Sequence, residues 1–416
     1  MLRTLSFFLA LLGLGLSEKV TFENHKVYRL LPETQEQVDL LHKMEDSVGF
    51  SFWKGPSYVN KSVDLMVTPS NLAEFTELMT LNGLKYEVYV DNVQRLIDTE
   101  NPKTRSSSKD GSISLNEYHT LDEIYSYVEY LAKNYKEVEV VDAGRTSEGR
   151  VIKGVKISYQ EGNPGIFIEA GIHAREWITP ATALYLLDQL LNSTDKNIRA
   201  LAEKHDWYIF PSFNPDGYVY THSKNRMWRK TRSHKNTFCA GADANRNWDF
   251  KWMSGGASNY PCAETYAGSS AFSEPETKSM AKYIKSVGNK LFAYISFHSY
   301  SQLLMFPYGH TSAHLDNYNE ELSIGKKTIE ALRQRYGTKY VTGNIAETIY
   351  VASGSSSDWV KANLKLPVVF TYEFRDTGKY GFLLPADQII PNGEEILDSL
   401  LAMFQEASRL GYPNSA

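Results

Sequence analysis

The sequence has few cysteines, no excess of basic residues and no long apolar run beyond its first residues. Of 416 residues only two are cysteine, and the formal net charge is −5. A nucleic-acid-binding protein would usually carry a basic face, so this charge argues against that class. No segment after the N-terminal stretch is apolar and long enough to span a membrane. The hydrophobic fraction of 42% and the charged fraction of 22% are ordinary for a soluble globular protein.

The first 17 residues, MLRTLSFFLALLGLGLS, have the features of a secretory signal peptide. Arg3 precedes an apolar run from Leu5 to Leu16, and Gly15 and Ser17 supply small residues where cleavage is expected. The run is too short to be a good membrane span. We therefore expect cleavage after Ser17 and an exported mature protein.

The two cysteines, Cys239 and Cys262, fit that compartment. In an oxidising environment an isolated pair is most simply one disulfide, closing a loop of about two dozen residues. Two buried free thiols are the alternative. The triplets NKS at Asn60 and NST at Asn192 are candidate glycosylation sites, although such triplets are common by chance.

Residues 19–95 are predicted to form a small α/β sandwich. KVYRLL, SVDLMVT and KYEVYV have strand patterns, and ETQEQVDLLHKMED and PSNLAEFTELMTLNG have apolar residues at helical spacing. The following segment, residues 98–112, is polar and rich in serine, and it contains Lys103, Arg105 and Lys109. This composition predicts a linker that a trypsin-like protease can cut.

From residue 118 onward the chain is predicted to form one larger α/β unit. Helical patterns alternate with the apolar strands VEVVDAG, IKGVKIS, GIFIEA, WYIFPSF, LFAYISF and PVVFTYEF. Such alternation predicts a mixed, mainly parallel sheet flanked by helices on both faces.

Polar side chains stand at the ends of three of these strands. His173 follows GIFIEAGI, His298 follows LFAYISF, and Glu373 closes VVFTY. Because ligands of such folds bind beyond the carboxyl ends of the strands, these side chains are expected to share a site. Glu176 lies three residues after His173, in a loop that leads to a helix predicted to have Thr179 as its cap.

A histidine and a carboxylate three residues apart can bind one metal ion, but the same spacing occurs in ordinary polar turns. A catalytic zinc site needs about three His or Glu ligands and an open position for water, and His173, Glu176 and His298 supply such a set. The HExxH motif is excluded, because no histidine follows His173 four residues later. Zinc would lower the pKa of its bound water to roughly 7, and Glu373 is placed to accept the proton.

Basic residues gather in two further motifs. Arg226 and Arg229 belong to NRMWRK, and Asn245 and Arg246 belong to DANRNW. The cluster is either a solvated surface or a pocket for a carboxylate, which a guanidinium binds through two hydrogen bonds. For Arg175, inside HARE, a purely solvated role is less natural.

Seven motifs together resemble the zinc metallocarboxypeptidases of the pancreatic and digestive A/B type. They occur in the family's order: YHTLDEIY, GIHAREW, NPDGY, NRMWRKTRS, DANRNW, SFHSYSQLLMFPYG and TYEFRDTGKYGF. One motif would be weak support, whereas seven in order are highly specific. A relative that binds peptide ends without cutting them usually lacks the general base or a metal ligand, and this chain keeps both.

The resemblance implies a secreted, monomeric, zinc-dependent exopeptidase that acts on peptides and proteins with a free C-terminus. It implies one Zn²⁺ per chain, bound by His173, Glu176 and His298. Glu373 matches the general base. Arg229 matches the residue that polarises the scissile carbonyl and stabilises the oxyanion.

The remaining matches concern substrate binding. Asn245, Arg246 and Tyr350 match the group that holds the substrate's terminal carboxylate, and this group disfavours a different zinc amidohydrolase. Arg175 matches a residue of the outer subsites.

The resemblance also divides the chain into parts. Residues 1–17 match a signal peptide, 18–105 an inhibitory activation segment removed by a trypsin-like protease, and 106–416 the catalytic domain. The two cysteines match the family's disulfide. The family's cis peptide bonds are expected here at Ser299–Tyr300, Pro307–Tyr308 and Arg375–Asp376.

The resemblance finally predicts which C-terminal residues are removed. By alignment, the side-chain pocket is lined by Met305, Gly309, Ile345, Ile349, Ala352, Ser357 and Thr371. Most of these are apolar, which favours Phe, Tyr, Leu or Met ends.

Ser357 departs from the family, in which A-type enzymes carry a large aliphatic residue there and B-type enzymes an aspartate. Serine cannot neutralise a buried Lys or Arg, so a roomy A-type pocket is predicted. Asp358 would enter the pocket only if the alignment slipped by one residue.

Overall fold

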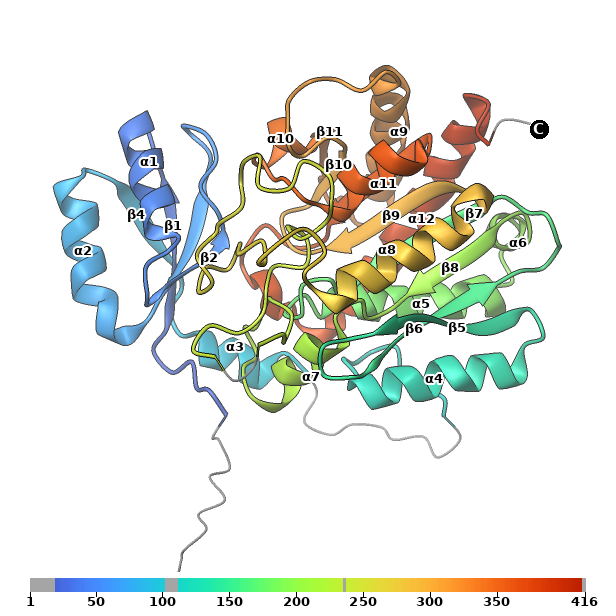
Figure 1. The fold of residues 1–416 in the computed structure, drawn as a ribbon, viewed down its shortest axis with the longest axis horizontal. Coiled ribbons are helices and arrows are strands. Elements are labelled where there is room, and N and C mark those ends of the chain that lie inside the picture. The colour runs from blue at the N-terminus through green and yellow to red at the C-terminus, as the bar shows by residue number, and fades with distance from the viewer. Residues whose placement is uncertain (1–18, 102–110, 235–236, 414–416) are drawn as a thin grey trace, which may run out of the picture.

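The computed structural model describes residues 19–101, 111–234 and 237–413, which form two packed units (Figure 1). The small unit is residues 19–101 and the large unit is residues 111–413. The predicted signal peptide and the predicted cleavage site at Arg105 lie outside the described residues. Among the residues described, no helix is both long and apolar enough to cross a membrane.

The small unit is a four-stranded antiparallel sheet with two helices on one face (Figure 1). Its order is β2-β3-β1-β4. The elements are β1 (Lys26–Leu31), α1 (Gln35–Met44), β2 (Phe50–Lys54), β3 (Val63–Val67), α2 (Leu72–Leu81), β4 (Lys85–Val90) and α3 (Val93–Thr99). The predicted strands and helices are present, whereas β2 and α3 were not predicted. The polar segment predicted to begin at residue 98 therefore starts inside a helix.

Alternation along β3 decides which side chains leave the small unit. Val63, Leu65 and Val67 pack beneath α1 and α2. Asp64 and Met66 point to the opposite face, because successive side chains of a strand alternate. All five residues are buried, which shows that this second face is covered too.

The large unit contains an eight-stranded mixed sheet of order β11-β10-β12-β9-β7-β8-β6-β5. The pairs β11–β10, β12–β9, β9–β7 and β7–β8 are parallel, and the other three are antiparallel. The strands are β5 (Val138–Arg145), β6 (Val151–Ile157), β7 (Gly165–Ala170), β8 (Asp206–Phe210), β9 (Leu291–His298), β10 (Leu303–Phe306), β11 (Val341–Asn344) and β12 (Val368–Glu373). The mixed, mainly parallel sheet is confirmed, although the four-residue strands β10 and β11 were not predicted.

Helices cover both faces of this sheet, as predicted (Figure 1). In β7, Ile166 and Ile168 join one apolar cluster, while Phe167 between them joins the other. The first cluster contains residues of α4 (Leu121–Asn134), α5 (Ile178–Asn192), α9 (Tyr318–Tyr336) and α12 (Ile389–Arg409). The second contains residues of α8 (Pro275–Val287) and α11 (Ser356–Leu364). Shorter helices complete the unit: α6 (Lys196–Glu203), α7 (Pro215–Ser223) and α10 (Ile345–Thr348).

The start of α5 differs from the prediction. The helix begins at Ile178, and its N-cap is Trp177, which makes no side-chain capping bond. Thr179 instead lies inside the first turn, where its hydroxyl accepts from the N–H of Gly171 (2.9 Å) and donates to the carbonyl of Glu176 (3.0 Å). Thr179 therefore ties the loop before the helix to the end of β7.

Four local expectations are confirmed. Cys239 and Cys262 form a disulfide, with their Cα atoms 4.8 Å apart. The peptide bonds Ser299–Tyr300, Pro307–Tyr308 and Arg375–Asp376 are cis.

The two units meet through an apolar cluster and two buried contacts that each contain an ion pair, within the small unit at Asp64 and across the units at Glu100. The cluster joins Trp53 and Met66 of the small unit to Met227, Tyr300 and Phe382 of the large unit. This contact provides the cover for the second face of the small sheet.

Asp64 is the centre of the first ionic contact. Its carboxylate accepts two hydrogen bonds from Arg29, both at 2.7 Å, and one from the hydroxyl of Tyr300 at 2.8 Å. Arg29 also donates to the carbonyl of Thr377 (2.7 Å). The small unit thus reaches the residue that lies two positions after His298.

Glu100 makes the second ionic contact. It is fully buried against Arg226, whose guanidinium stacks on Trp177 (3.8 Å to the ring centre). Arg226 also donates to the carbonyls of Arg175 and Phe382, both at 2.9 Å. The last turn before the linker is therefore fixed to the large unit.

Candidate active site

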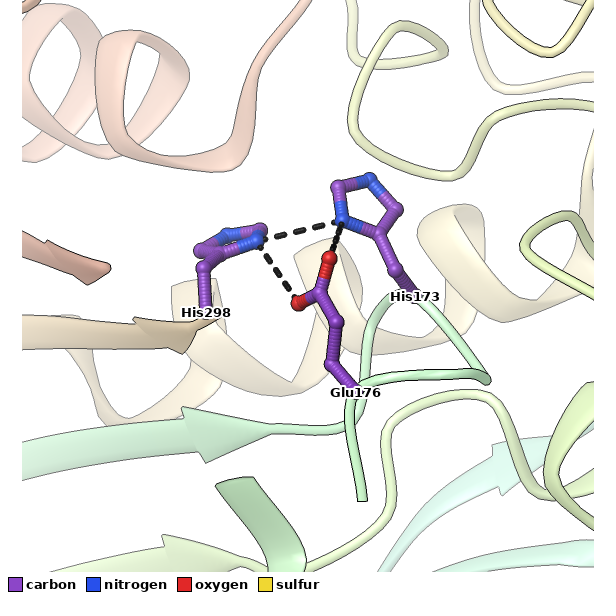
Figure 2. A group of neighbouring side chains, drawn as sticks. All are labelled: His173, Glu176 and His298. Atoms are coloured by element: carbon purple, nitrogen blue, oxygen red, sulfur yellow. Dashed lines mark hydrogen bonds and ion pairs between the residues drawn. The ribbon is translucent and has the colours of Figure 1, made fainter. Parts of the chain in front are cut away.

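His173, Glu176 and His298 come together at the carboxyl edge of the large sheet (Figure 2). His173 and Glu176 lie in the loop between β7 and α5, and His298 is the last residue of β9. Because β7 and β9 are parallel neighbours, both chain segments leave the sheet at the same edge. All three side chains are buried, and one ligand atom from each lies within 4.8 Å of the others.

Glu176 lies between the two imidazoles. Its Oε1 is 2.8 Å from Nδ1 of His173, its Oε2 is 3.3 Å from Nδ1 of His298, and the two Nδ1 atoms are 3.2 Å apart (Figure 2). Burial alone would raise the pKa of Glu176, but the two histidines lower it below its usual value. Two imidazole nitrogens and an ionised carboxylate converging on one point are the donor set of a catalytic zinc site.

Asp243 supports this triad from the other side. Its Oδ1 is 3.0 Å from Nε2 of His173 and accepts from the backbone N–H of Asn245 (2.8 Å). Its Oδ2 accepts from Arg229 (2.8 and 3.2 Å). Burial favours the neutral acid, yet Arg229 and His173 hold the pKa of Asp243 well below its usual range. A carboxylate on the second nitrogen of a metal-binding histidine fixes the tautomer and the ring orientation.

Sequence reasoning did not single out Asp243 as functional. The signal was available in DANRNW, where Asp243 immediately precedes Ala244 and two predicted substrate-binding residues. The aspartate fixes Arg229 as well, so one buried carboxylate aligns a predicted metal ligand and a predicted oxyanion-binding residue.

Glu373 ends β12 directly beside His298, because these two residues are paired in the parallel ladder β12–β9. Its side chain is partly exposed. Desolvation, with a further contribution from the charge of Glu176, raises the pKa of Glu373 to about 8. A carboxylate whose pKa lies near neutrality has the proton affinity that a general base needs.

Arg246 and Tyr350 lie near each other. The guanidinium of Arg246 is 5.7 Å from the ring centre of Tyr350. Arg246 is held by the carbonyls of Gly256 (2.8 Å) and Asn245 (3.0 Å). The structure therefore brings the predicted carboxylate-binding residues to one region, with Asn245 next to Arg246 in the chain.

A cavity of about 680 Å³ lies between the two units at this site. Arg175, Arg229, Arg246 and Tyr350 line it from the large unit. The small unit contributes the other wall, through residues that include His42, Glu45, Asp46, Phe52 and Trp53. The small unit therefore roofs the cleft into which the predicted substrate-binding residues project.

Arg175 is in direct contact with this roof. It donates to the carbonyl of Phe52 (3.3 Å) and pairs with Glu264 (3.2 Å). Its guanidinium lies 4.2 Å from the ring centre of Phe382. The side chain is fully buried while the small unit is in place.

The residues predicted to line the side-chain pocket come from β10, α10, α11 and β12 and from the loops that follow β10 and α10. Met305 on β10 pairs with Thr371 on β12, and the Thr371 hydroxyl is hydrogen-bonded to that of Ser357 on α11 (2.7 Å). A side chain at Gly309 would lie 3.2 Å from Ile345 and 2.8 Å from the carbonyl of Ala352. Ile349 follows α10 and is partly exposed. Among the described residues, none of these seven lines the 680 Å³ cavity.

Asp358 lies next to these residues but is fully engaged elsewhere. Its carboxylate accepts from the backbone N–H groups of Gly309 (2.7 Å) and His310 (3.1 Å) and contacts Nδ1 of His310 (2.8 Å). The Asp358 side chain therefore fixes the wall at Gly309, and Ser357 is the residue that meets Thr371.

Comparison with known proteins agrees with this geometry. The profile of the family described as "Zinc carboxypeptidase" matches residues 124–399. The chain belongs to the zinc carboxypeptidase family. The profile described as "Carboxypeptidase activation peptide" matches residues 28–100 of this zinc carboxypeptidase, which is nearly all of the small unit.

Relatives of this zinc carboxypeptidase align over almost its whole length. "Zinc carboxypeptidase A 1" of Anopheles gambiae is 47% identical over 412 residues, covering 97% of this chain and 95% of the relative. "Carboxypeptidase A1" of Bos taurus is 39% identical over 406 residues, covering 95% and 96%. The crystal structure of carboxypeptidase A from Helicoverpa armigera superposes with a TM-score of 0.86 at 28% identity, covering 94% of this chain and 99% of that one.

Proposed function

We propose that this zinc carboxypeptidase is a secreted, monomeric A-type enzyme, made as a zymogen. It removes single aromatic or aliphatic residues from the C-termini of peptides and proteins. The observation that carries the proposal is the triad of His173, Glu176 and His298. Glu373 lies beside His298, and Arg229, which is 3.9 Å from Glu176, lines the adjoining cleft together with Arg175 and Arg246. The small unit roofs that cleft.

The proposed chemistry divides between a bound zinc ion and the protein. Held by His173, Glu176 and His298, Zn²⁺ would supply Lewis-acid polarisation and a water of lowered pKa. Glu373, beside His298, takes a proton from the attacking water and returns it to the leaving amine. Arg229, aligned by Asp243, stabilises the oxygen on which negative charge develops.

The proposed substrate contacts explain why the enzyme acts only at chain ends. Arg246, Asn245 and Tyr350 hold the terminal carboxylate, for which a guanidinium is the best-matched partner. A residue inside a chain has no carboxylate at that position and forfeits this binding. Arg175 contacts residues further from the cut bond and is freed when the small unit leaves.

The proposed A-type preference rests on the neighbourhood of Ser357. Met305, Ile345, Ile349 and Ala352 supply apolar surface, and the hydroxyls of Ser357 and Thr371 satisfy each other. A buried Lys or Arg side chain would find no anionic partner there, because the carboxylate of Asp358 already accepts from two backbone amides.

The proposed processing follows the domain limits inferred from the sequence. Residues 1–17 are a signal peptide, 18–105 an activation segment and 106–416 the catalytic domain. A trypsin-like protease cuts after Arg105 in the polar linker. The match of residues 28–100 to an activation peptide supports this division.

A panel of peptides that differ only in the last residue tests the proposal. The full-length protein is treated with trypsin, and kcat/KM is measured for Phe, Leu, Lys and Glu ends, with and without a metal chelator. Phe and Leu ends should be cleaved fastest, and the chelator should abolish all cleavage. Faster removal of Lys than of Phe overturns the A-type assignment but leaves a zinc carboxypeptidase. Release of internal fragments overturns the exopeptidase assignment.

A further inference from the structure

We infer that Glu169 is a positioning residue for substrate binding, a role that rests on the carboxylate-binding function proposed above for Asn245. Glu169 acts through Ser356, which fixes the orientation of the Asn245 side-chain amide. The hydrogen bonds of Glu169 go to Ser296 and Ser356, so its effect on Asn245 is indirect.

Glu169 is a fully buried carboxylate that joins three elements of the large unit. It lies on β7, directly opposite Ser296 in the β7–β9 ladder. Its Oε1 accepts from the hydroxyl of Ser296 (2.8 Å) and from the hydroxyl of Ser356 in the first turn of α11 (2.7 Å). A buried carboxylate is costly unless hydrogen-bonded, so its presence fixes both hydroxyls in place.

Ser356, held by Glu169, in turn fixes the side chain of Asn245. Its backbone N–H donates to Oδ1 of Asn245 (2.9 Å). The oxygen of the Asn245 amide is therefore committed to the start of α11. The NH₂ group must point the other way, and Nδ2 lies 3.4 Å from Nε2 of His298.

The orientation of this amide decides whether Asn245 can bind a carboxylate. An amide presents donors on its nitrogen and acceptors on its oxygen. With the oxygen held by Ser356, Asn245 offers N–H donors toward the site, which suits an anionic ligand. A rotated amide would place its oxygen there and repel a carboxylate.

The same turn of α11 also carries the proposed pocket wall. Ser355 caps the helix by accepting from the N–H of Asp358 (3.3 Å), and Ser357 is bonded to Thr371. Ser356 lies between these residues and is the one tied to the sheet by Glu169. Glu169 therefore fixes the part of α11 that Asn245 needs.

Two matched substitutions separate positioning from general stability. Ser356→Ala and Ser296→Ala each remove one hydroxyl from the same carboxylate oxygen, and both serines are fully buried. Only Ser356 is linked to Asn245. In the trypsin-activated enzyme, Ser356→Ala should raise KM for a Phe-ended peptide about fivefold with kcat little changed, the result expected when uniform binding is lost. Ser296→Ala should leave KM near the wild-type value, although both variants lower Tm.

A double-mutant cycle with Asn245→Ala tests the route. Asn245→Ala should raise KM at least as much as Ser356→Ala, and the double variant should show no further increase. Equal KM values for Ser356→Ala and Ser296→Ala, or an additive double variant, overturn the role of Glu169. If Asn245→Ala itself leaves KM unchanged, the proposed carboxylate pocket fails, and the positioning role fails with it.

Substitution of Glu169 completes the test. Glu169→Gln keeps an acceptor oxygen for both serines and should retain a wild-type KM. Glu169→Met has a similar length and no strong acceptor, and it should reproduce the raised KM of Ser356→Ala. A wild-type KM in Glu169→Met refutes the inference.

Discussion

The two sheets of the molecule differ in how their second face is covered. The eight-stranded sheet has its own helices on both faces, with separate apolar clusters above and below. The four-stranded sheet has α1 and α2 on one face, and its other face packs on Val93 of the short helix α3 and on Met227, Tyr300 and Phe382 of the large unit. The small unit is therefore completed by the surface that it covers.

One contact therefore has two structural roles, since it completes the core of the small unit and holds that unit over the cleft. The large unit builds its metal site from its own strands, so the chemistry belongs to it alone. The small unit reaches the site only by docking, through Asp64, the carbonyl of Phe52 and Glu100. We therefore expect substitutions at the site of the large unit to change catalysis. Substitutions at the contacts of the small unit should change how easily substrate reaches the cleft.

The largest effect should come from the general base. Glu373→Gln keeps the size of the side chain but removes the proton acceptor, and kcat of the activated enzyme should fall by about 10³-fold or more. Zinc content, measured by atomic absorption, should be unchanged. His298→Ala is the comparison, because it should lose both zinc and activity. Near-normal turnover of Glu373→Gln would rule out Glu373 as the base.

A smaller effect is expected from the pocket. Ser357→Asp places a carboxylate beside Thr371, where it can pair with a buried Lys or Arg side chain. The ratio of kcat/KM for Lys ends to that for Phe ends should rise on the order of 100-fold. Ser357→Asn is the control of similar size without the charge. An unchanged ratio in Ser357→Asp would show that another residue faces the substrate side chain.

Access of substrate to the cleft of the uncleaved protein should increase when Asp64 is substituted. The uncleaved zymogen should be nearly inactive, and Asp64→Asn should raise its activity about tenfold, because the Arg29–Asp64 pair that holds the contacts with Tyr300 and Thr377 loses its negative charge. Glu33→Gln is the control, since Glu33 forms an exposed ion pair with Lys85 on the same unit. The prediction fails if both variants are equally latent. If uncleaved wild-type protein is as active as the cleaved form, the prediction that the zymogen is inactive is wrong.

The smallest effect concerns pH and stability. Burial raises the pKa of Glu276, on α8, to about 7, while the unfolded value is 4.5. The folded state then holds the proton more tightly, so stability falls as pH rises from about 4.5 to 7. Glu276→Gln keeps the acceptor for Ser147 and should raise Tm at pH 8 by about 3 °C relative to wild type, with little difference at pH 4. The same Tm difference at both pH values would contradict this assignment.

The sequence was most informative where function and local pattern coincide. The apolar run GIFIEA predicts a buried strand, and residues that follow such strands in an α/β sheet share one edge. This reasoning placed His173, His298 and Glu373 together, as the structure has them. The alternation of helices and strands also predicted helices on both faces of the large sheet, and the presence of only two cysteines predicted the disulfide.

Long-range contacts were not predictable in this way. Glu169 and Ser356 are 187 residues apart, and nothing in either neighbourhood names the other. Alternation in SVDLMVT shows that Asp64 faces away from Val63 and Leu65. It does not show that the hydroxyl of Tyr300 donates to the Asp64 carboxylate. Thr179 misled the prediction because a threonine before a helix usually caps it, whereas here a tertiary contact with Gly171 takes the hydroxyl.

The tether between the units has a further consequence, which concerns concentration. While the chain between the two units is intact, binding of the activation segment to the large unit is intramolecular, and its effective concentration at the cleft is high. After the cut, the apolar cluster and the Glu100–Arg226 pair still bind, but as a bimolecular complex. Because release of the segment would then follow mass action, we expect a cleaved zymogen to stay inactive when concentrated and to become active on dilution.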